Sequence, residues 1–121
     1  MNKYRNVKTV VGGIQFDSKR EASRWQELKL LERAGKIAGL KRQVEYILAP
    51  SVKFEGAKRA QPAMRIKVDF AYQEITRTGA GMSWSNNILE DTKSPATVTT
   101  AFTMRRHLLK HIHGLDIRLT K

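Results

Sequence analysis

The stretch MRIKVDFAY, residues 64–72, alternates apolar and polar side chains along almost its whole length. Alternation with a period of two predicts a β-strand that buries one face and exposes the other. Asp69 would lie on the polar face together with Arg65 and Lys67. A solvated strand face explains such an acid without any function, so a functional interpretation of Asp69 needs a second feature of the sequence.

A second predicted strand ends in the segment EDTK, residues 90–93, and supplies that feature. Asp91 and Lys93 are two positions apart and emerge from one face of the strand, whereas Glu90 emerges from the other. If the two strands pair, Asp69 and Asp91 can approach within reach of one metal ion. Glu90 competes for the role of second ligand, but its position away from Lys93 favours Asp91.

Paired carboxylates at Asp69 and Asp91, together with the backbone carbonyl of Thr92, are hard oxygen ligands of the kind that Mg²⁺ prefers. A bound Mg²⁺, for which Mn²⁺ could substitute, would polarise a phosphate and lower the pKa of a bound water. Lys93 could orient that water or stabilise charge in the transition state. The pattern therefore favours metal-dependent hydrolysis of a phosphate ester.

Glu21 has two competing interpretations. Ser18 followed by Glu21 has the spacing of a capping box at the start of a helix, in which the acid has only a structural role. Glu21 also shares a helical stripe with Trp25 and Leu28, which should face the sheet, so its carboxylate could complete the metal site from the helix side. The residues alone leave both roles open.

The remaining patterns place these segments in an α+β domain with a small mixed sheet flanked by helices. Strands joined by a helix should be parallel and strands joined by loops antiparallel. Residues 1–16 form a basic arm and a hairpin, and residues 17–121 form the single domain. The expected order is a hairpin at 9–16, a helix at 18–34, strands at 44–48, 64–72 and 88–93, a helix from 97 or 99 to 113, and a strand at 115–119, with an exposed basic loop at 51–63 and a Gly-, Ser- and Asn-rich connection at 76–87.

The charge of the chain favours a polyanionic partner. The 121 residues carry a formal net charge of +12 and contain no cysteine, which excludes disulfides and thiolate zinc sites. No apolar run is long enough to span a bilayer, so a cytoplasmic protein without membrane association is expected. Nucleic acid is the commonest partner of such a chain, and the candidate DNA contacts are Lys3, Arg5, Lys8, Lys53, Lys58, Arg59, Thr99, Arg105 and Arg106.

The acids, the lysine and the element order resemble the PD-(D/E)XK nuclease superfamily, whose pattern is an acid, a variable gap and then acid-x-Lys. The resemblance covers residues 17–120 and is closer to small phage-encoded nucleases, on the segments FDSKREA (16–22), LKRQV (40–44), Val-Asp-Phe and Glu-Asp-x-Lys, and on the spacing of Thr99, Phe102 and Arg105. It implies a restriction-endonuclease-like core, with Glu21, Asp69, Asp91 and Lys93 as the active site and Glu21 among the metal ligands. Val68 in place of proline, Ser94 in place of glycine and the long connection at 76–87 depart from the pattern and bear mainly on substrate contacts.

The resemblance further implies a structure-selective DNA endonuclease. Small members of the superfamily act on DNA shape, many as homodimers on four-way junctions, so a phage Holliday-junction resolvase with no nucleotide cofactor is the leading expectation. A nicking or restriction-like endonuclease on duplex DNA, a transposase-like end-cleaving subunit and a non-catalytic basic DNA-binding protein are the alternatives. The acids argue against the last, because carboxylates facing a phosphate repel it unless a cation intervenes.

Overall fold

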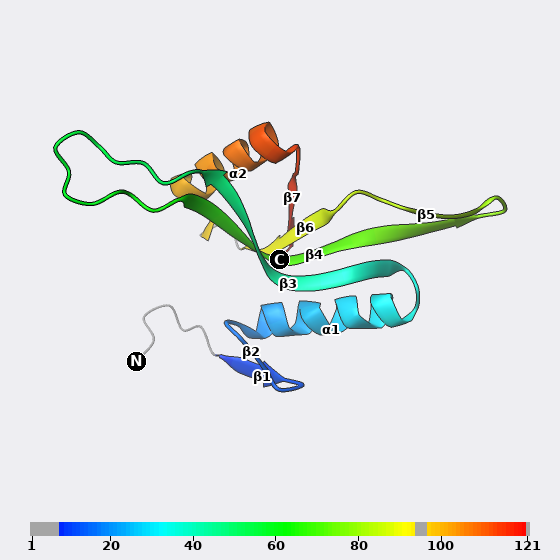
Figure 1. The fold of residues 1–121 in the computed structure, drawn as a ribbon. Coiled ribbons are helices and arrows are strands. Elements are labelled where there is room, and N and C mark those ends of the chain that lie inside the picture. The colour runs from blue at the N-terminus through cyan, green and yellow to red at the C-terminus, as the bar shows by residue number, and fades with distance from the viewer. Residues whose placement is uncertain (1–7, 94–96, 121) are drawn as a thin grey trace.

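A twisted sheet lies between α1 on one side and α2 on the other (Figure 1). The computed structural model describes residues 8–93 and 97–120. The predicted α+β class is confirmed. Its elements are β1 (Thr9–Val11), β2 (Ile14–Phe16), α1 (Lys19–Arg33), β3 (Ile37–Ala49), β4 (Met64–Thr78), β5 (Gly81–Trp84), β6 (Ile88–Thr92), α2 (Thr100–His113) and β7 (Ile117–Thr120).

The main sheet has the order β3-β4-β6-β7, and β5 pairs with the far end of β4. Pairs joined by loops are antiparallel, while β6 and β7, which α2 connects, are parallel. This is the pairing that the connections predict, because a helical crossover returns the chain in the same direction. β1 and β2 form a separate hairpin beside α1 (Figure 1).

Both helices begin and end as their capping residues predict. The Ser18 hydroxyl accepts a hydrogen bond from the Glu21 amide, and the Thr99 hydroxyl accepts one from the Phe102 amide. α2 ends at Gly114, whose φ of 70° lies in the left-handed region that glycine adopts without steric cost. No helix among residues 8–93 and 97–120 is long and apolar enough to cross a membrane.

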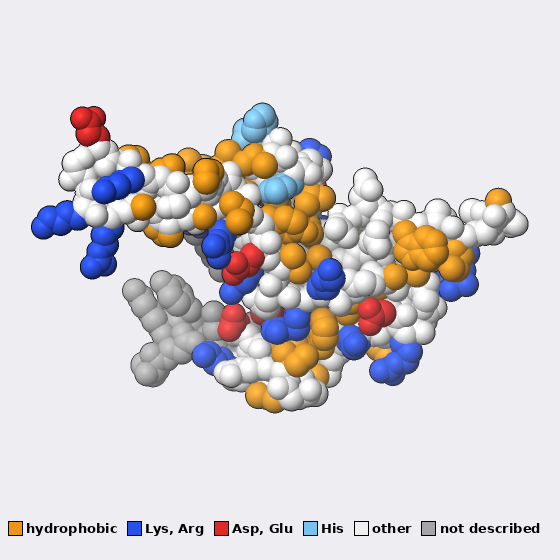
Figure 2. Space-filling model, in the orientation of Figure 1, with side chains coloured by type: hydrophobic (Ala, Val, Ile, Leu, Met, Phe, Trp, Pro, Cys, Tyr) orange, Lys and Arg blue, Asp and Glu red, His pale blue; other side chains and the backbone are white. Residues whose placement is uncertain are grey.

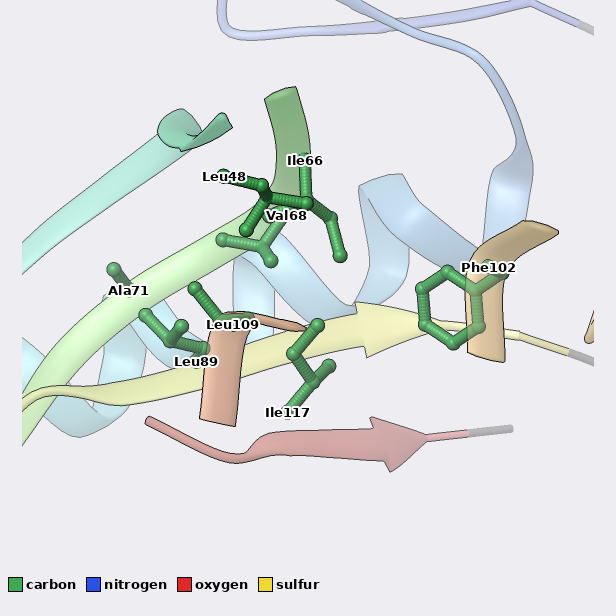
Figure 3. Packing of buried hydrophobic residues seen from close by; sticks show 8 residues of the cluster. All are labelled: Leu48, Ile66, Val68, Ala71, Leu89, Phe102, Leu109 and Ile117. Atoms are coloured by element: carbon green, nitrogen blue, oxygen red, sulfur yellow. The ribbon is translucent and has the colours of Figure 1, made fainter. Parts of the chain in front are cut away.

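The single apolar face predicted for residues 64–72 is wrong. Ile66 and Val68 pack in the core beneath α2, whereas Phe70 and Tyr72 pack in a second core against α1. Figure 3 shows the first of these cores, which is made by Leu48, Ile66, Val68, Ala71, Leu89, Phe102, Leu109 and Ile117. β4 therefore changes the face that it buries between Val68 and Phe70.

β3 changes its buried face at the same level. Val44 and Tyr46 lie against the α2 core and Leu40 lies against the α1 core. Between them Gln43 has a φ of 55°, a left-handed conformation that interrupts strand alternation. Because β3 and β4 change their buried faces at the same level, both strands can bury apolar residues under α2 at one end and under α1 at the other. A strand with a single apolar face could not do this.

The predicted connection at 76–87 is also wrong in part. β4 continues to Thr78 and turns back through β5, with Ile75 opposite Trp84 and Thr78 opposite Gly81. The β-branched residues on the β4 side favour strand, Gly79 lies in the turn and Gly81 begins β5. This ribbon projects away from the helices (Figure 1), and the loop at 51–63, which is exposed as predicted, projects at the other end of β4.

Candidate active site

Two aspartates from neighbouring strands lie opposite each other where β4 and β6 separate. The antiparallel register pairs Phe70 with Glu90, so its next step sets Asp69 against Asp91. The Asp69 amide donates to Asp91 Oδ1 at 2.8 Å, and the Thr92 amide donates to Asp69 Oδ2 at 2.9 Å. Each carboxylate thus takes the place of a backbone carbonyl of the ladder, which fixes both side chains at the opening between the strands.

Burial disfavours the ionised forms of both aspartates. Asp91 is only 3% exposed, and its burial, followed by the charge of Asp69, raises its pKa to about 6. Burial also raises the pKa of Asp69, against the opposing effect of the Thr92 amide. The amides alone do not offset the effect of burial on these two adjacent carboxylates, so the pair gains from a proton or a cation.

Glu21 reaches the same region from the first turn of α1. The Ser18 hydroxyl accepts a hydrogen bond from the Glu21 amide, whereas the Glu21 carboxylate bonds outside the helix. Glu21 Oε1 accepts a hydrogen bond from Gln43 Nε2 at 2.9 Å and lies 4.0 Å from Arg42 Nη2. Burial, followed by the charges of Asp69 and Asp17, raises the pKa of Glu21 to about 7. The capping interpretation therefore accounts for the backbone of Glu21 and leaves its side chain facing the aspartates.

Lys93 follows β6 and brings a positive charge to the site. Its amide donates to the Thr120 carbonyl at 2.9 Å, and its ammonium lies 4.9 Å from the centre of the Phe102 ring. A cavity of ≈ 460 Å³ opens at this point, with acids and cations on its walls. The residues that line it are Asp17, Ser18, Arg20, Glu21, Asp69, Thr92, Lys93 and Thr97.

The donor set fits a cation that keeps part of its water shell. Within the part of the chain that the structure describes, no three His, Cys, Asp or Glu side chains converge into a complete metal cage. Mg²⁺ commonly binds through one or two carboxylates and several waters, so the Asp69–Asp91 pair suits it better than it suits Zn²⁺ or Ca²⁺. The cavity beside Asp69 leaves space for those waters.

Glu90, the competing acid, is committed to a structural contact. It is fully buried and accepts hydrogen bonds from Arg24 Nε at 2.6 Å, from Arg24 Nη2 at 2.9 Å and from the Tyr72 hydroxyl. Burial and this carboxylate raise the pKa of Tyr72 to about 12, which keeps the hydroxyl a donor. The Arg24–Glu90 pair joins α1, which carries Glu21, to β6, which carries Asp91.

The candidate DNA contacts fall into three groups. Lys8, Lys53, Lys58, Arg59 and Arg105 are exposed, and Figure 2 shows cationic side chains at the tip of the 51–63 loop. Arg106 is half-buried and donates to the Ile117 carbonyl at 3.2 Å, while the Thr99 hydroxyl caps α2, so both have structural contacts. Lys3, Arg5 and Ser94 lie outside the described residues.

Sequence reasoning missed Gln43, Arg42 and Arg24. Nothing in the sequence signals the left-handed backbone of Gln43, which directs its amide to Glu21. Arg24 carries a weak signal, because it lies one helical turn after Glu21 and must share its side of the helix. A larger hollow of ≈ 700 Å³ between residues 86–89 and 113–118 lies at the other end of β6 and contains no acid pair.

This α+β fold, with an acid pair and a lysine beside a cavity, defines a small protein with a candidate hydrolytic site. A family model described as Protein of unknown function (DUF1064) matches residues 1–120. The chain belongs to this family. Searches of curated proteins and of solved structures found no match.

The raised pKa of Glu21 predicts how stability depends on pH without a divalent cation. The folded state holds the Glu21 proton more tightly than the unfolded state, whose pKa is near 4.5, so stability is lost as pH rises from about 4.5 to about 7. Glu21→Gln removes this penalty and should stabilise the protein by up to about 3 kcal/mol at pH 8, with little effect at pH 4. Urea unfolding in EDTA at both pH values measures the difference.

The exposed Glu55 on the 51–63 loop provides the control, because Glu55→Gln should change stability at neither pH. A Glu21→Gln protein that is less stable than wild type at pH 8 would contradict the placement of this carboxylate beside Asp69.

Proposed function

We propose that this protein is a metal-dependent DNA endonuclease that hydrolyses phosphodiester bonds with the catalytic set of the PD-(D/E)XK nucleases. The observation that carries the proposal is the Asp69–Asp91 pair, held at the opening between β4 and β6, with Asp69 and Lys93 lining one cavity. Hydrolysis of a phosphodiester needs charge neutralisation at the phosphate and an activated water. Paired acids and a lysine beside a water-accessible cavity are suited to both.

Asp69, Asp91 and the Thr92 carbonyl would hold Mg²⁺ or Mn²⁺, with Glu21 as the acid on the helix side. The bound cation would polarise the scissile phosphate and lower the pKa of a bound water. Lys93 would orient that water or neutralise charge on a phosphate oxygen. The contact of its ammonium with the Phe102 ring, 4.9 Å away, gives Lys93 a second partner besides the aspartates.

The order of the elements supports the same class. α1, the strands β3, β4 and β6, then α2 and β7 follow the helix, three strands, helix, strand order of the PD-(D/E)XK core, with β5 as an addition. The acids also lie where that core has them, two on adjacent strands and one on the preceding helix. The fold alone would not assign a function, so the proposal depends on the site.

DNA is the substrate that the charge favours. The net charge of +12 persists although the site itself is acidic, so cations on the rest of the surface can hold a polyanion around it. A non-catalytic DNA-binding protein is the second candidate, but the carboxylates of Glu21, Asp69 and Asp91 next to bound phosphates would oppose binding. We further propose that the enzyme acts as a homodimer on branched DNA, as a phage Holliday-junction resolvase in the host cytoplasm, because so small a protein has little surface for reading sequence. Nicking or restriction-like cutting of duplex DNA is the alternative within the enzyme class.

Cleavage of labelled four-way junction, fork and duplex DNA tests the function directly. Wild type should cut the junction fastest in Mg²⁺ or Mn²⁺ and not at all in EDTA. Asp91→Asn should lower the rate by about 10²-fold or more while junction binding in Ca²⁺ survives, because the lost charge belongs to the cation site. Asp116→Asn, an exposed aspartate paired with Lys110, is the matched control and should cut like wild type.

Two other outcomes of the cleavage assay would favour the alternative functions. Equal cutting of duplex and junction would move the protein to the restriction-like alternative. Tight binding without cutting in either metal would reject the nuclease and favour the DNA-binding protein.

The basic loop at 51–63 predicts the salt dependence of DNA binding. The triple substitution of Lys53, Lys58 and Arg59 by Ala should reduce the slope of log affinity against log salt by about 2 to 3, because each phosphate contact contributes about 0.9. Fluorescence anisotropy across a salt series measures the slope. The same charge removed at Lys29, Arg33 and Lys36, near the end of α1, is the control. Equal slopes for both triple variants would show that the loop contributes no more phosphate contacts than the end of α1.

A further inference from the structure

Gln43 has an unusual backbone conformation directly beside the candidate active site. It is the only residue other than glycine with a positive φ, 55°, among residues 8–93 and 97–120. A side chain in this region has steric cost that glycine would avoid, and such conformations persist mainly at functional positions. The pairs Arg42–Phe70 and Val44–Val68 flank Gln43 in the sheet, so the residue opposite it is Asp69.

The conformation of Gln43 lets the side chains of two consecutive residues approach the same carboxylate. Neighbouring residues of a regular strand point to opposite faces, yet Gln43 Nε2 and Arg42 Nη2 lie 2.9 Å and 4.0 Å from the same atom, Glu21 Oε1. The left-handed φ at Gln43 supplies the break in alternation that this requires. The guanidinium of Arg42 lies over the Phe16 ring, 4.8 Å from its centre, so the close contact with Glu21 is made by the neutral amide.

We propose that Gln43 is a positioning residue, whose amide holds the Glu21 carboxylate on the cavity that Asp69 lines, so that Glu21 can bond the water shell of a cation that Asp69 and Asp91 would hold. This inference rests on the proposed function. A neutral donor suits the role, because it fixes one carboxylate oxygen without neutralising the negative charge that a cation needs. It also leaves Glu21 Oε2 free of that contact. Groups that orient ligands in this way act on metal affinity and rate without contacting the substrate.

A purely structural role for Gln43 makes a different prediction. If the position serves only to reverse the buried face of β3, the backbone matters and the amide does not. Glycine adopts the left-handed conformation more readily than any other residue, so Gln43→Gly would then be as active as wild type. The positioning role predicts that the same substitution preserves the fold and lowers activity.

The experiment compares Gln43→Gly with Gln43→Ala, which both lack the amide but differ in how well they tolerate a positive φ. The melting temperature of Gln43→Gly should exceed that of Gln43→Ala. Both variants should cut saturating junction DNA about 10- to 100-fold more slowly than wild type with an unchanged KM, and their Mn²⁺ Kd by calorimetry should rise by a similar factor. Gln73→Ala, which removes an amide bonded to the Ser85 carbonyl, is the control and should match wild type in rate and Mn²⁺ affinity.

Wild-type rate and Mn²⁺ affinity in Gln43→Gly would overturn the inference and leave the nuclease intact. A wild-type protein that neither cuts DNA nor binds Mn²⁺ would overturn the proposed function and this inference together, and the wild type alone would reveal it. If Gln43→Ala fails to fold, the Gln43→Gly protein still decides between the two roles.

Discussion

The reciprocal hydrogen bonding of Asp69 and Asp91 is the constraint around which the site is organised. An amide of one strand donates to the carboxylate of the other, and the Thr92 amide completes the exchange. These bonds allow β4 and β6 to separate without leaving those amides unpaired, which would be costly in the interior. They also hold two carboxylates together where burial raises the pKa of both. The arrangement is costly for a structural element and useful for a cation site.

The two cores explain why the acids can be reached from both helices. β3 and β4 change their buried faces together at the level of Gln43 and Asp69, so the core under α2 ends where the core under α1 begins. The site lies at this boundary, where neither core fills the space between the strands. α1 contributes Glu21 from one side, and Lys93 approaches Phe102 of α2 from the other. The buried Arg24–Glu90 pair then fixes α1 against β6.

Much of the fold could be predicted because its signals are local. Ser18, Thr99 and Gly114 define helix ends through contacts within a few residues, and the alternation in residues 64–72 identifies a strand. The face reversal within that strand could not be predicted, because it depends on the conformation of Gln43 in another strand. The extension of β4 into the ribbon with β5 was missed because its turn glycines resemble those of an irregular loop. For the site, strand pairing was expected to bring Asp69 and Asp91 within reach of one cation, whereas the contact of Glu21 with Gln43 depends on tertiary packing.

Locating a bound cation would show whether Asp69 and Asp91 form a cation site. The anomalous signal of Mn²⁺ in crystals of the protein would show its position without any assumption about the substrate. We expect a peak between the carboxylates of Asp69 and Asp91, on the side of the cavity and of Glu21, that disappears in Asp91→Asn. A peak only at surface residues such as His107 and His111, with nothing between the aspartates, would contradict it and leave the acid pair a structural feature of the sheet.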